Sequence, residues 1–199
     1  MRTAAVLVLA LAAAPLLAQS NDVAAWGGTS TVGTTTLIGS DVHFDRGTSF
    51  GVSFTHFFSH HYAAEAALFD IRHNGAIRVG GVDAIDTGRL TMTPVSLTLQ
   101  WHAEHAHRFD PYAGGGIAWV RAGSLHSADL DAAGIGHVSV KSRAGFTALV
   151  GASYAITHPF AVAVEARYFG YHPASGPPDA RVTLELSPIV YSFGLRWRF

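Results

Sequence analysis

The sequence predicts an all-β fold, an eight-stranded antiparallel up-and-down transmembrane β-barrel, from three observations. First, large apolar residues alternate with small or polar ones along residues 189–199, which is the period of a strand whose two faces meet different environments. Second, only 14% of the residues are charged, against roughly 25% in typical soluble domains. Third, short and long connections alternate between the expected strands, as they do in outer-membrane barrels.

The N-terminal segment is expected to direct export. Residues 1–18 carry one positive residue, an apolar run and then Ala18 before polar residues, which is typical of a secretory signal peptide. The apolar run is shorter than the ~20 residues of a membrane-spanning helix. We therefore expect residues 19–199 to form the barrel domain, without disulfides because the sequence has no cysteine. With a formal net charge of −1 and no basic patch, nucleic acid is not expected as a partner.

The first three strands are expected at residues 22–31, 47–56 and 62–72. The first has the weakest pattern, because residues 27–36 are almost all Gly, Thr and Ser. In the second, large side chains at even positions alternate with small ones. In the third, Glu65 stands on the face opposite to an apolar one. Each pattern predicts a strand with one apolar and one polar face.

The fourth strand, residues 90–102, contains a break in its pattern. Leu90 and Met92 are apolar at even positions, whereas the apolar residues from Val95 onward stand at odd positions. The phase changes at Pro94, which has no N–H to offer a neighbouring strand. A β-bulge would restore the register, and we predict one at Pro94.

The last four strands are expected at residues 111–121, 144–155, 160–168 and 189–199. Three glycines leave the facing of the first of them open. The connections alternate between short ones at 57–61, 105–110 and 156–159 and long ones at 73–88, 122–142 and 173–186. Outer-membrane barrels have short turns in the periplasm and long loops outside, so both termini are expected in the periplasm.

A soluble secreted barrel, such as a lipocalin-like carrier, is the alternative fold. It would turn its apolar face inward and cover its outer face with many Lys and Glu residues. Here the polar faces carry few charges, and aromatic residues recur near strand ends. They are Tyr62, Trp101, Trp119, Tyr154, Tyr168, Trp197 and Phe199. Aromatic residues at such places are typical of the girdles at the two membrane surfaces, which favours a membrane barrel.

Two motifs resemble a known family. Residues 90–101 read LTMTPVSLTLQW and residues 110–117 read DPYAGGGI. Their order and spacing resemble the OmpW family of outer-membrane proteins, in which a Thr-x-x-Pro stretch leads to a Gln–aromatic pair and then to Pro-Tyr-x-Gly-x-Gly. The resemblance covers about residues 47–199. It implies an eight-stranded barrel in the cell outer membrane and a narrow passage for small, often hydrophobic, molecules.

The resemblance also implies that the outer-membrane assembly machinery inserts the chain by reading a terminal aromatic strand. The side chains that would form this assembly signal are Tyr191, Phe193, Leu195, Trp197 and Phe199.

Six polar side chains are expected to line the lumen: Glu65, Gln100, Glu165, Arg167, Arg196 and Arg198. The interior of an eight-stranded barrel is just wide enough for side chains to fill it. Buried charges there need partners, and Glu165 is the expected partner of the two terminal-strand arginines. The six residues either line and gate a conduit or form salt bridges that plug the barrel. The filled interior favours the plug.

Twelve histidines raise the question of a metal site. The candidates are His102, His105 and His107, and the pair His60 and His61. No cysteine accompanies them, and no cluster of acids beyond Glu104 completes the ligand set of a metal site. We interpret them as turn or interfacial histidines and expect no metal and no cofactor.

Catalysis would need a Ser, a His and an acid held within hydrogen-bond reach. Such residue types occur at 126–129 and 137–142, in a long loop without a nucleophile motif or a strand to fix them. An enzyme is therefore not expected.

The sequence thus predicts a monomeric outer-membrane barrel that is a narrow passive channel or binding protein for small hydrophobic molecules. Its expected partners are outer-membrane lipid, the assembly machinery and a small hydrophobic solute. The alternatives are a non-conducting structural or interaction barrel whose external loops bind a partner, and the soluble secreted carrier.

Overall fold

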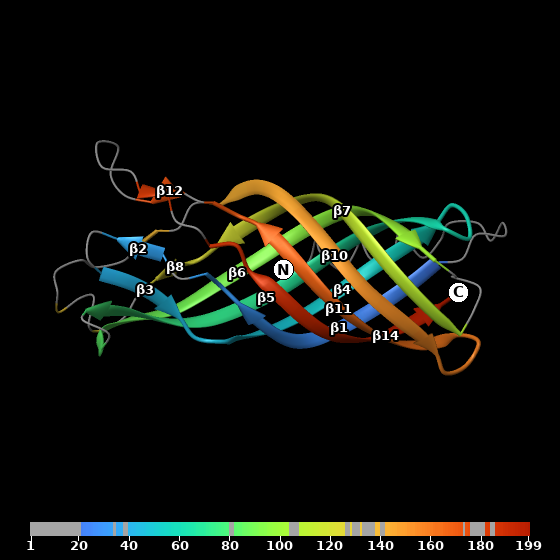
Figure 1. Cartoon of the computed structure of the whole chain (residues 1–199), viewed down its shortest axis with the longest axis horizontal. Helices are drawn as coiled ribbons and strands as arrows, with labels where there is room; N and C mark the ends of the chain where they lie inside the picture. Colours follow the sequence, from blue (N-terminus) through green and yellow to red (C-terminus); the bar gives the residue numbers. More distant parts are fainter. Residues whose placement is uncertain are drawn as a thin grey trace, which may run out of the picture.

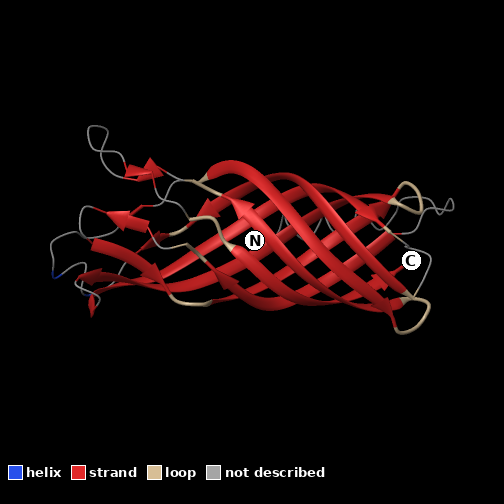
Figure 2. Cartoon of the chain, viewed as in Figure 1, coloured by secondary structure: helices blue, strands red, loops and turns tan. Residues whose placement is uncertain are grey.

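The computed structural model is a closed antiparallel β-barrel (Figures 1 and 2), which confirms the predicted fold. It describes residues 21–33, 35–37, 40–79, 82–103, 108–125, 128, 132, 138–139, 142–172, 174–175, 182–183 and 186–199. The predicted signal peptide lies outside these residues. In the described part of the chain, no helix is long and apolar enough to cross a membrane.

Eight long strands of the described chain form the wall, each antiparallel to its neighbours. They are β1 (Asn21–Thr31), β4 (Gly47–Phe57), β5 (Tyr62–Val79), β6 (Val82–His102), β7 (Phe109–Ala122), β10 (Arg143–Ala155), β11 (Phe160–Gly170) and β14 (Ile189–Arg198). The last strand, β14, pairs with both β11 and β1 and so closes the sheet on the first strand. Reciprocal backbone hydrogen bonds of 2.9 Å between Asn21 and Phe199 complete this seam.

The two ends of the barrel differ. The connections 58–61 and 156–159 lie at one end together with Asn21, Phe199 and the ends of β6 and β7 at His102 and Phe109, and we call it the turn end. The opposite end, the loop end, carries the longer connections and their short strands (Figure 1). These are β2 (Thr35–Leu37), β3 (Ser40–Phe44), β8 (Ser124–Leu125), β9 (Val138–Ser139), β12 (Ala174–Ser175) and β13 (Val182–Thr183).

The predicted loop at residues 73–88 is wrong, because β5 and β6 continue through it as a paired hairpin. The ladder absorbs register shifts between Gly75 and Ala76 and between Ile77 and Arg78. Gly88 adopts a φ of 81°, in the left-handed region that glycine tolerates best. A strand surrounded by water rather than lipid can be rich in Gly and polar residues, so the composition alone did not distinguish it from a loop.

The predicted bulge at Pro94 is also wrong. The ladder of β6 with β5 keeps one register on both sides of Pro94, and the ladder with β7 passes through it without a shift. Leu90 and Met92 stand on the inward face of β6 and are fully buried. The pattern changes phase because the interior itself becomes apolar at the loop end, while the strand continues regularly.

The outer face of the wall is apolar. Large side chains such as Phe50, Leu99 and Ile117 are 64–69% exposed on it. At the turn end, aromatic residues stand opposite one another on neighbouring strands, in the pairs Tyr62–Trp101, Phe109–Tyr154 and Phe160–Trp197. Soluble monomers rarely expose contiguous apolar surface of this extent, whereas membrane barrels carry such a belt with aromatic girdles. The soluble-carrier alternative is therefore wrong.

Candidate functional site: the barrel lumen

The lumen contains the polar side chains that the sequence singles out. Glu65, Gln100, Glu165, Arg167 and Arg196 are 0–4% exposed. They come from β5, β6, β11 and β14, where each stands on the face opposite to the exposed apolar residues. Arg198, the nearest of the six to the turn end, keeps 24% of its side chain exposed.

Arg167 bridges the lumen. Its Nη2 lies 2.5 Å from Oε1 of Glu65 on β5, and its Nε donates to Oε1 of Glu165 at 2.7 Å. Its Nη1 donates to Oγ of Ser96 on β6 at 3.1 Å. In the closed strand order, β11 lies across the barrel from β5, so this side chain joins opposite walls. The second oxygen of Glu165, Oε2, accepts from the Tyr112 hydroxyl at 3.1 Å, which fixes the carboxylate further.

Arg196 pairs with a residue that the sequence did not single out. The expected acid, Glu165, stands opposite Ser192 in the ladder, about four residues along β14. Asp22 on β1 stands opposite Arg198 and diagonal to Arg196. Its Oδ1 accepts from Nε of Arg198 at 3.1 Å, and its Oδ2 lies 3.9 Å from Nη1 of Arg196. The weak pattern of the first strand hid Asp22, because no clear alternation assigned it to the inward face.

Three aromatic rings support these arginines. The Arg196 guanidinium carbon lies 4.6 Å from the ring centre of Tyr112 and 5.6 Å from that of Trp26. Arg167 lies 5.2 Å from the ring centre of Phe69. Cation–π contacts of this kind favour the charged guanidinium inside the barrel.

Each of these rings lies flat against a glycine on the neighbouring strand. The ladder pairs are Trp26–Gly194, Phe69–Gly51 and Tyr112–Gly151. A Cβ on any of the three glycines would overlap atoms of the facing ring. Glycine therefore lets the ring lie along the wall, and the flat ring leaves the centre of the lumen to the arginine. The sequence alone missed these pairs because they become visible only when the register is known.

His102 is buried in the lumen near the turn end, so its interpretation as a turn or interfacial histidine is wrong. It continues the inward face of β6 two residues beyond Gln100. Its Nδ1 lies 2.7 Å from Oδ2 of Asp110, its Nε2 lies 3.1 Å from Oε1 of Gln100, and its ring stacks on Tyr112. His60 and His61 are exposed in a turn, whereas His105 and His107 lie outside the described residues.

A metal site does not emerge in the part that the structure describes. No three His, Asp or Glu side chains gather there as metal ligands would. Of the residues weighed for catalysis, His126, Ser127, Asp129 and His137 lie outside the described residues, whereas Ser139 and Ser142 are described.

The loop-end half of the lumen is mostly apolar, with Ser30 and His73 as buried polar residues. Eight side chains there are at most 1% exposed and belong to one hydrophobic cluster, which we call the apolar section. They are Ile71, Leu90, Met92, Val120, Phe169, Tyr171, Leu186 and Val190. The lumen thus has two parts in series, an apolar section toward the loop end and a network of ions and hydrogen bonds toward the turn end.

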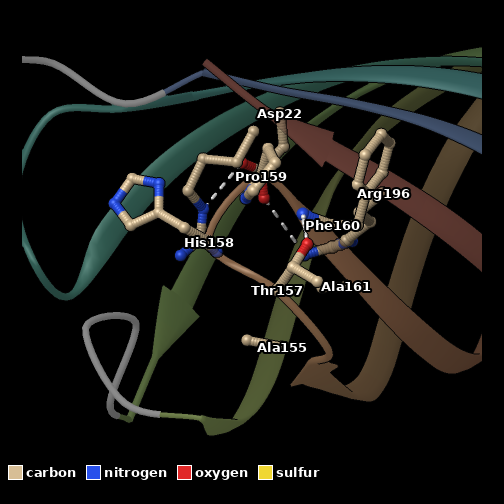
Figure 3. Close-up of a pocket in the computed structure, with 9 residues that line it drawn as sticks. Asp22, Ala155, Thr157, His158, Pro159, Phe160, Ala161 and Arg196 are labelled. Atoms are coloured by element: carbon tan, nitrogen blue, oxygen red, sulfur yellow. Dashed lines mark hydrogen bonds and ion pairs between the residues drawn. The ribbon is translucent and has the colours of Figure 1, made fainter.

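A small cavity of about 10 Å³ lies at the turn end (Figure 3). Asp22, His158, Arg196 and Arg198 are among its lining residues. Its volume corresponds to about one water molecule, so a solute could not occupy it. Figure 3 shows Asp22 and Arg196 converging on this cavity from β1 and β14. Asp22 and Arg196, each 1% exposed, fill the lumen beside this cavity.

The chain is similar to outer-membrane proteins over most of its length. The OmpW family model matches residues 16–199. The uncharacterized outer-membrane protein y4mB of Sinorhizobium fredii is 26% identical over 168 residues, which cover 81% of this chain and 70% of that protein.

Two solved structures share the fold. The crystal structure of the outer membrane protein OprG from Pseudomonas aeruginosa matches with a TM-score of 0.73 at 19% identity, over 90% of this chain and 96% of that one. The solution structure of the E. coli outer membrane protein W matches with a TM-score of 0.51 at 20% identity, over 92% of this chain and 100% of that one.

Proposed function

The chain belongs to the OmpW family and lies in the cell outer membrane, and from this premise we propose that it binds small hydrophobic molecules in its apolar section and passes them passively. In outer-membrane barrels the short turns face the periplasm, so the loop end faces outside. A hydrophobic molecule from outside would meet the apolar section before it met the ions.

The apolar section is the observation that carries this proposal. Ion pairs along the whole lumen would be enough to stabilise the interior of a barrel. Toward the loop end, however, the inward positions hold Leu90 and Met92 on β6 and Phe169 on β11. A solute that buries ~150 Å² of apolar surface would gain about 4 kcal/mol before the entropy of binding is subtracted. Met92 has an unbranched, flexible side chain that can move to admit such a molecule.

The Arg167 bridge limits movement toward the periplasm. Glu65, Arg167 and Glu165 are desolvated and paired, and an apolar solute cannot replace any of their contacts. Breaking a buried ion pair costs about 3–5 kcal/mol, so passage beyond the bridge would be slow. The bridge therefore acts as the gate of a narrow route.

The experiment compares two substitutions on the same inward face of β6. Met92→Gln places an amide in the apolar section, whereas Gln100→Met removes an amide from the polar part. We expect Met92→Gln to weaken binding of a small hydrophobic fluorophore to the folded barrel at least tenfold, because a buried amide without partners disfavours an apolar ligand. Gln100→Met should leave the affinity within about twofold.

Heat-modifiable gel mobility would show that both variants are folded barrels. Equal affinities for the fluorophore in both variants, or no saturable binding to the unsubstituted chain, would overturn the proposal.

A second candidate is a non-conducting barrel that acts through its external loops. The bridge across the lumen favours it, because Arg167 is completely buried. Vesicles that contain the barrel and an internal quencher separate the two candidates. Faster quenching of the fluorophore than in empty vesicles supports passage, and binding without faster quenching supports the non-conducting barrel.

A further inference from the structure

Three exposed arginines stand on adjacent strands at the loop end of the wall. Arg72 is on β5, Arg89 on β6 and Arg121 on β7, and we call them the arginine patch. Arg72 lies opposite Thr91, and Arg121 lies opposite Thr93. Arg89 is two residues from Thr91 on the same strand. The three Cα atoms therefore fall within a few strand spacings, roughly 10–15 Å, which long arginine side chains can bridge.

The arginine patch continues the lipid-facing surface. Its residues share the outward face of their strands with Leu68, Val95 and Trp119, which are 43–55% exposed. Arg121 follows Trp119 by two residues in the direction of the loop end. Tryptophan marks the boundary between hydrocarbon and headgroups, so the arginine patch lies where the lipid headgroups of the outer leaflet begin.

Two of the three guanidinium groups have no partner among the described residues. Arg72 pairs with Asp70, with 2.6 Å between Nε and Oδ1. Neither Arg89 nor Arg121 makes a hydrogen bond or ion pair with the described part of the chain. Asp86, three residues from Arg89, uses Oδ1 to accept a hydrogen bond from the backbone of Gly88. The arginine patch thus offers free, forked N–H donors beside the membrane.

The outward arginines of the loop end gather on this side of the barrel, where the exposed Arg46 precedes β4, the neighbour of β5. At the loop ends of β10, β11 and β14, the outward positions in the described chain hold the neutral residues Ala144, Gly170 and Ile189. Arg143, at the start of β10, uses its Nη1 to donate to the His172 carbonyl. A one-sided cluster indicates a local binding surface rather than a ring around the barrel.

We propose that the arginine patch binds the phosphate groups of a glycolipid in the outer leaflet. Guanidinium matches phosphate in geometry, because its parallel N–H groups can donate to two phosphate oxygens. The position on the wall, beside the lipid-facing belt, selects a membrane lipid over a soluble ligand. Clusters of arginine at headgroup level bind anionic lipids in other membrane proteins for the same reasons.

The test uses the full barrel in phosphatidylcholine vesicles that contain lipid A, a diphosphorylated glucosamine lipid. Binding of the labelled lipid to the barrel is measured for the unsubstituted chain and for the double variant R89Q/R121Q. The control is Arg108→Gln, which removes an exposed arginine at the turn end. Heat-modifiable mobility confirms that each variant is folded.

We expect R89Q/R121Q to reduce lipid A binding at least tenfold and Arg108→Gln to change it less than twofold. Lipid A without its phosphates should bind the unsubstituted chain no better than it binds the double variant. Rising salt should weaken the phosphate-dependent part of lipid A binding and leave the remaining binding unchanged. Equal binding by all three chains would overturn the proposal. So would a soluble polyphosphate that binds as tightly as the lipid, because the membrane source would then be excluded.

Discussion

At the residue scale, the lumen depends on glycines that stand opposite aromatic rings. Gly194 faces Trp26, and a Cβ there would overlap the indole ring. We expect Gly194→Ala to lower the free energy of unfolding by about 1–3 kcal/mol, because overpacking forces the ring and Arg196 to move. Urea unfolding in detergent measures this change. Gly115→Ala is the control, since its Cβ would make an ordinary contact at 3.6 Å, and equal losses in both variants would contradict the argument.

The Arg167 bridge gives a second prediction at this scale. Arg167→Met leaves Glu65 and Glu165 buried without their cation, and we expect a loss of about 3–5 kcal/mol in the free energy of unfolding. Arg198→Gln should cost less than Arg167→Met, because the Arg198 side chain is partly solvated and its buried partner Asp22 keeps Arg196 as a second cation. The measurement is again urea unfolding of the refolded barrel.

A neutralised bridge provides a check on this prediction. In a triple variant that adds Glu65→Gln and Glu165→Gln to Arg167→Met, no buried charge of the bridge remains unpaired. We expect the triple variant to recover much of the lost stability. If it were less stable than Arg167→Met alone, unpaired carboxylates would not be the cause of the loss.

At the element scale, strand periodicity predicted the wall well, because lipid and lumen impose different residues on alternate positions. The strand at 189–199 shows this clearly, since its odd residues from Tyr191 to Phe199 are exposed and Arg196 is buried. Periodicity gave a wrong prediction at Pro94, because the inward residues change from polar to apolar there and this change resembles the phase shift of a bulge. It also failed for the β5–β6 hairpin, because residues 73–88 have the Gly- and Asp-rich composition of a loop. The pairing of Asp22 with Arg198 could not be predicted, because the pattern within one strand does not specify its register with the neighbouring strand.

His73 connects three elements at the loop end, beyond the apolar belt of β5. Its Nδ1–H donates to the carbonyl of Asp45 at 2.8 Å, and its Nε2 lies 2.9 Å from Oγ of Ser30 on β1. Burial lowers the pKa of His73 below its usual value near 6.5, and the bond to the Asp45 carbonyl opposes this in part. The folded chain therefore prefers the neutral ring, whereas the unfolded chain is protonated as the pH falls below about 6.5.

This linkage predicts how stability varies with pH. The contribution of His73 is fully present above pH ~6.5 and is lost as the pH falls below that value. We expect the melting temperature of the barrel to rise between pH 5 and pH 7, and to rise less in His73→Gln, which cannot titrate. Thermal unfolding of both chains across this range measures the difference. Identical pH slopes would show that His73 does not contribute.

At the scale of the whole molecule, the barrel closes only when the two ends of the domain meet. The β1–β14 ladder carries Asp22 opposite Arg198 and ends in the reciprocal bonds between Asn21 and Phe199. Closure therefore brings together the seam, the ion pairs of the turn end and Trp26 over Gly194. The ion pairs of Asp22 with Arg196 and Arg198 can form only after β14 has docked on β1, so the terminal strand is both a wall element and the last part of the lumen.

The final prediction concerns delivery of this strand to the membrane. We expect Phe199→Ala to reduce the amount of folded barrel in the outer membrane of cells several-fold, if the assembly machinery reads the terminal aromatic residue. On the outer face, the ring centre of Phe199 lies 5.1 Å from that of Trp197. The hydrogen bonds between Phe199 and Asn21 join backbone atoms, so they can form without the Phe199 ring. Phe109→Ala removes another exposed aromatic residue of the turn end and is the control. Refolded in detergent, both variants should have similar free energies of unfolding. If the amount of folded barrel in cells fell equally in Phe199→Ala and Phe109→Ala, the cause would be the loss of an exposed aromatic side chain and not the reading of Phe199 by the assembly machinery.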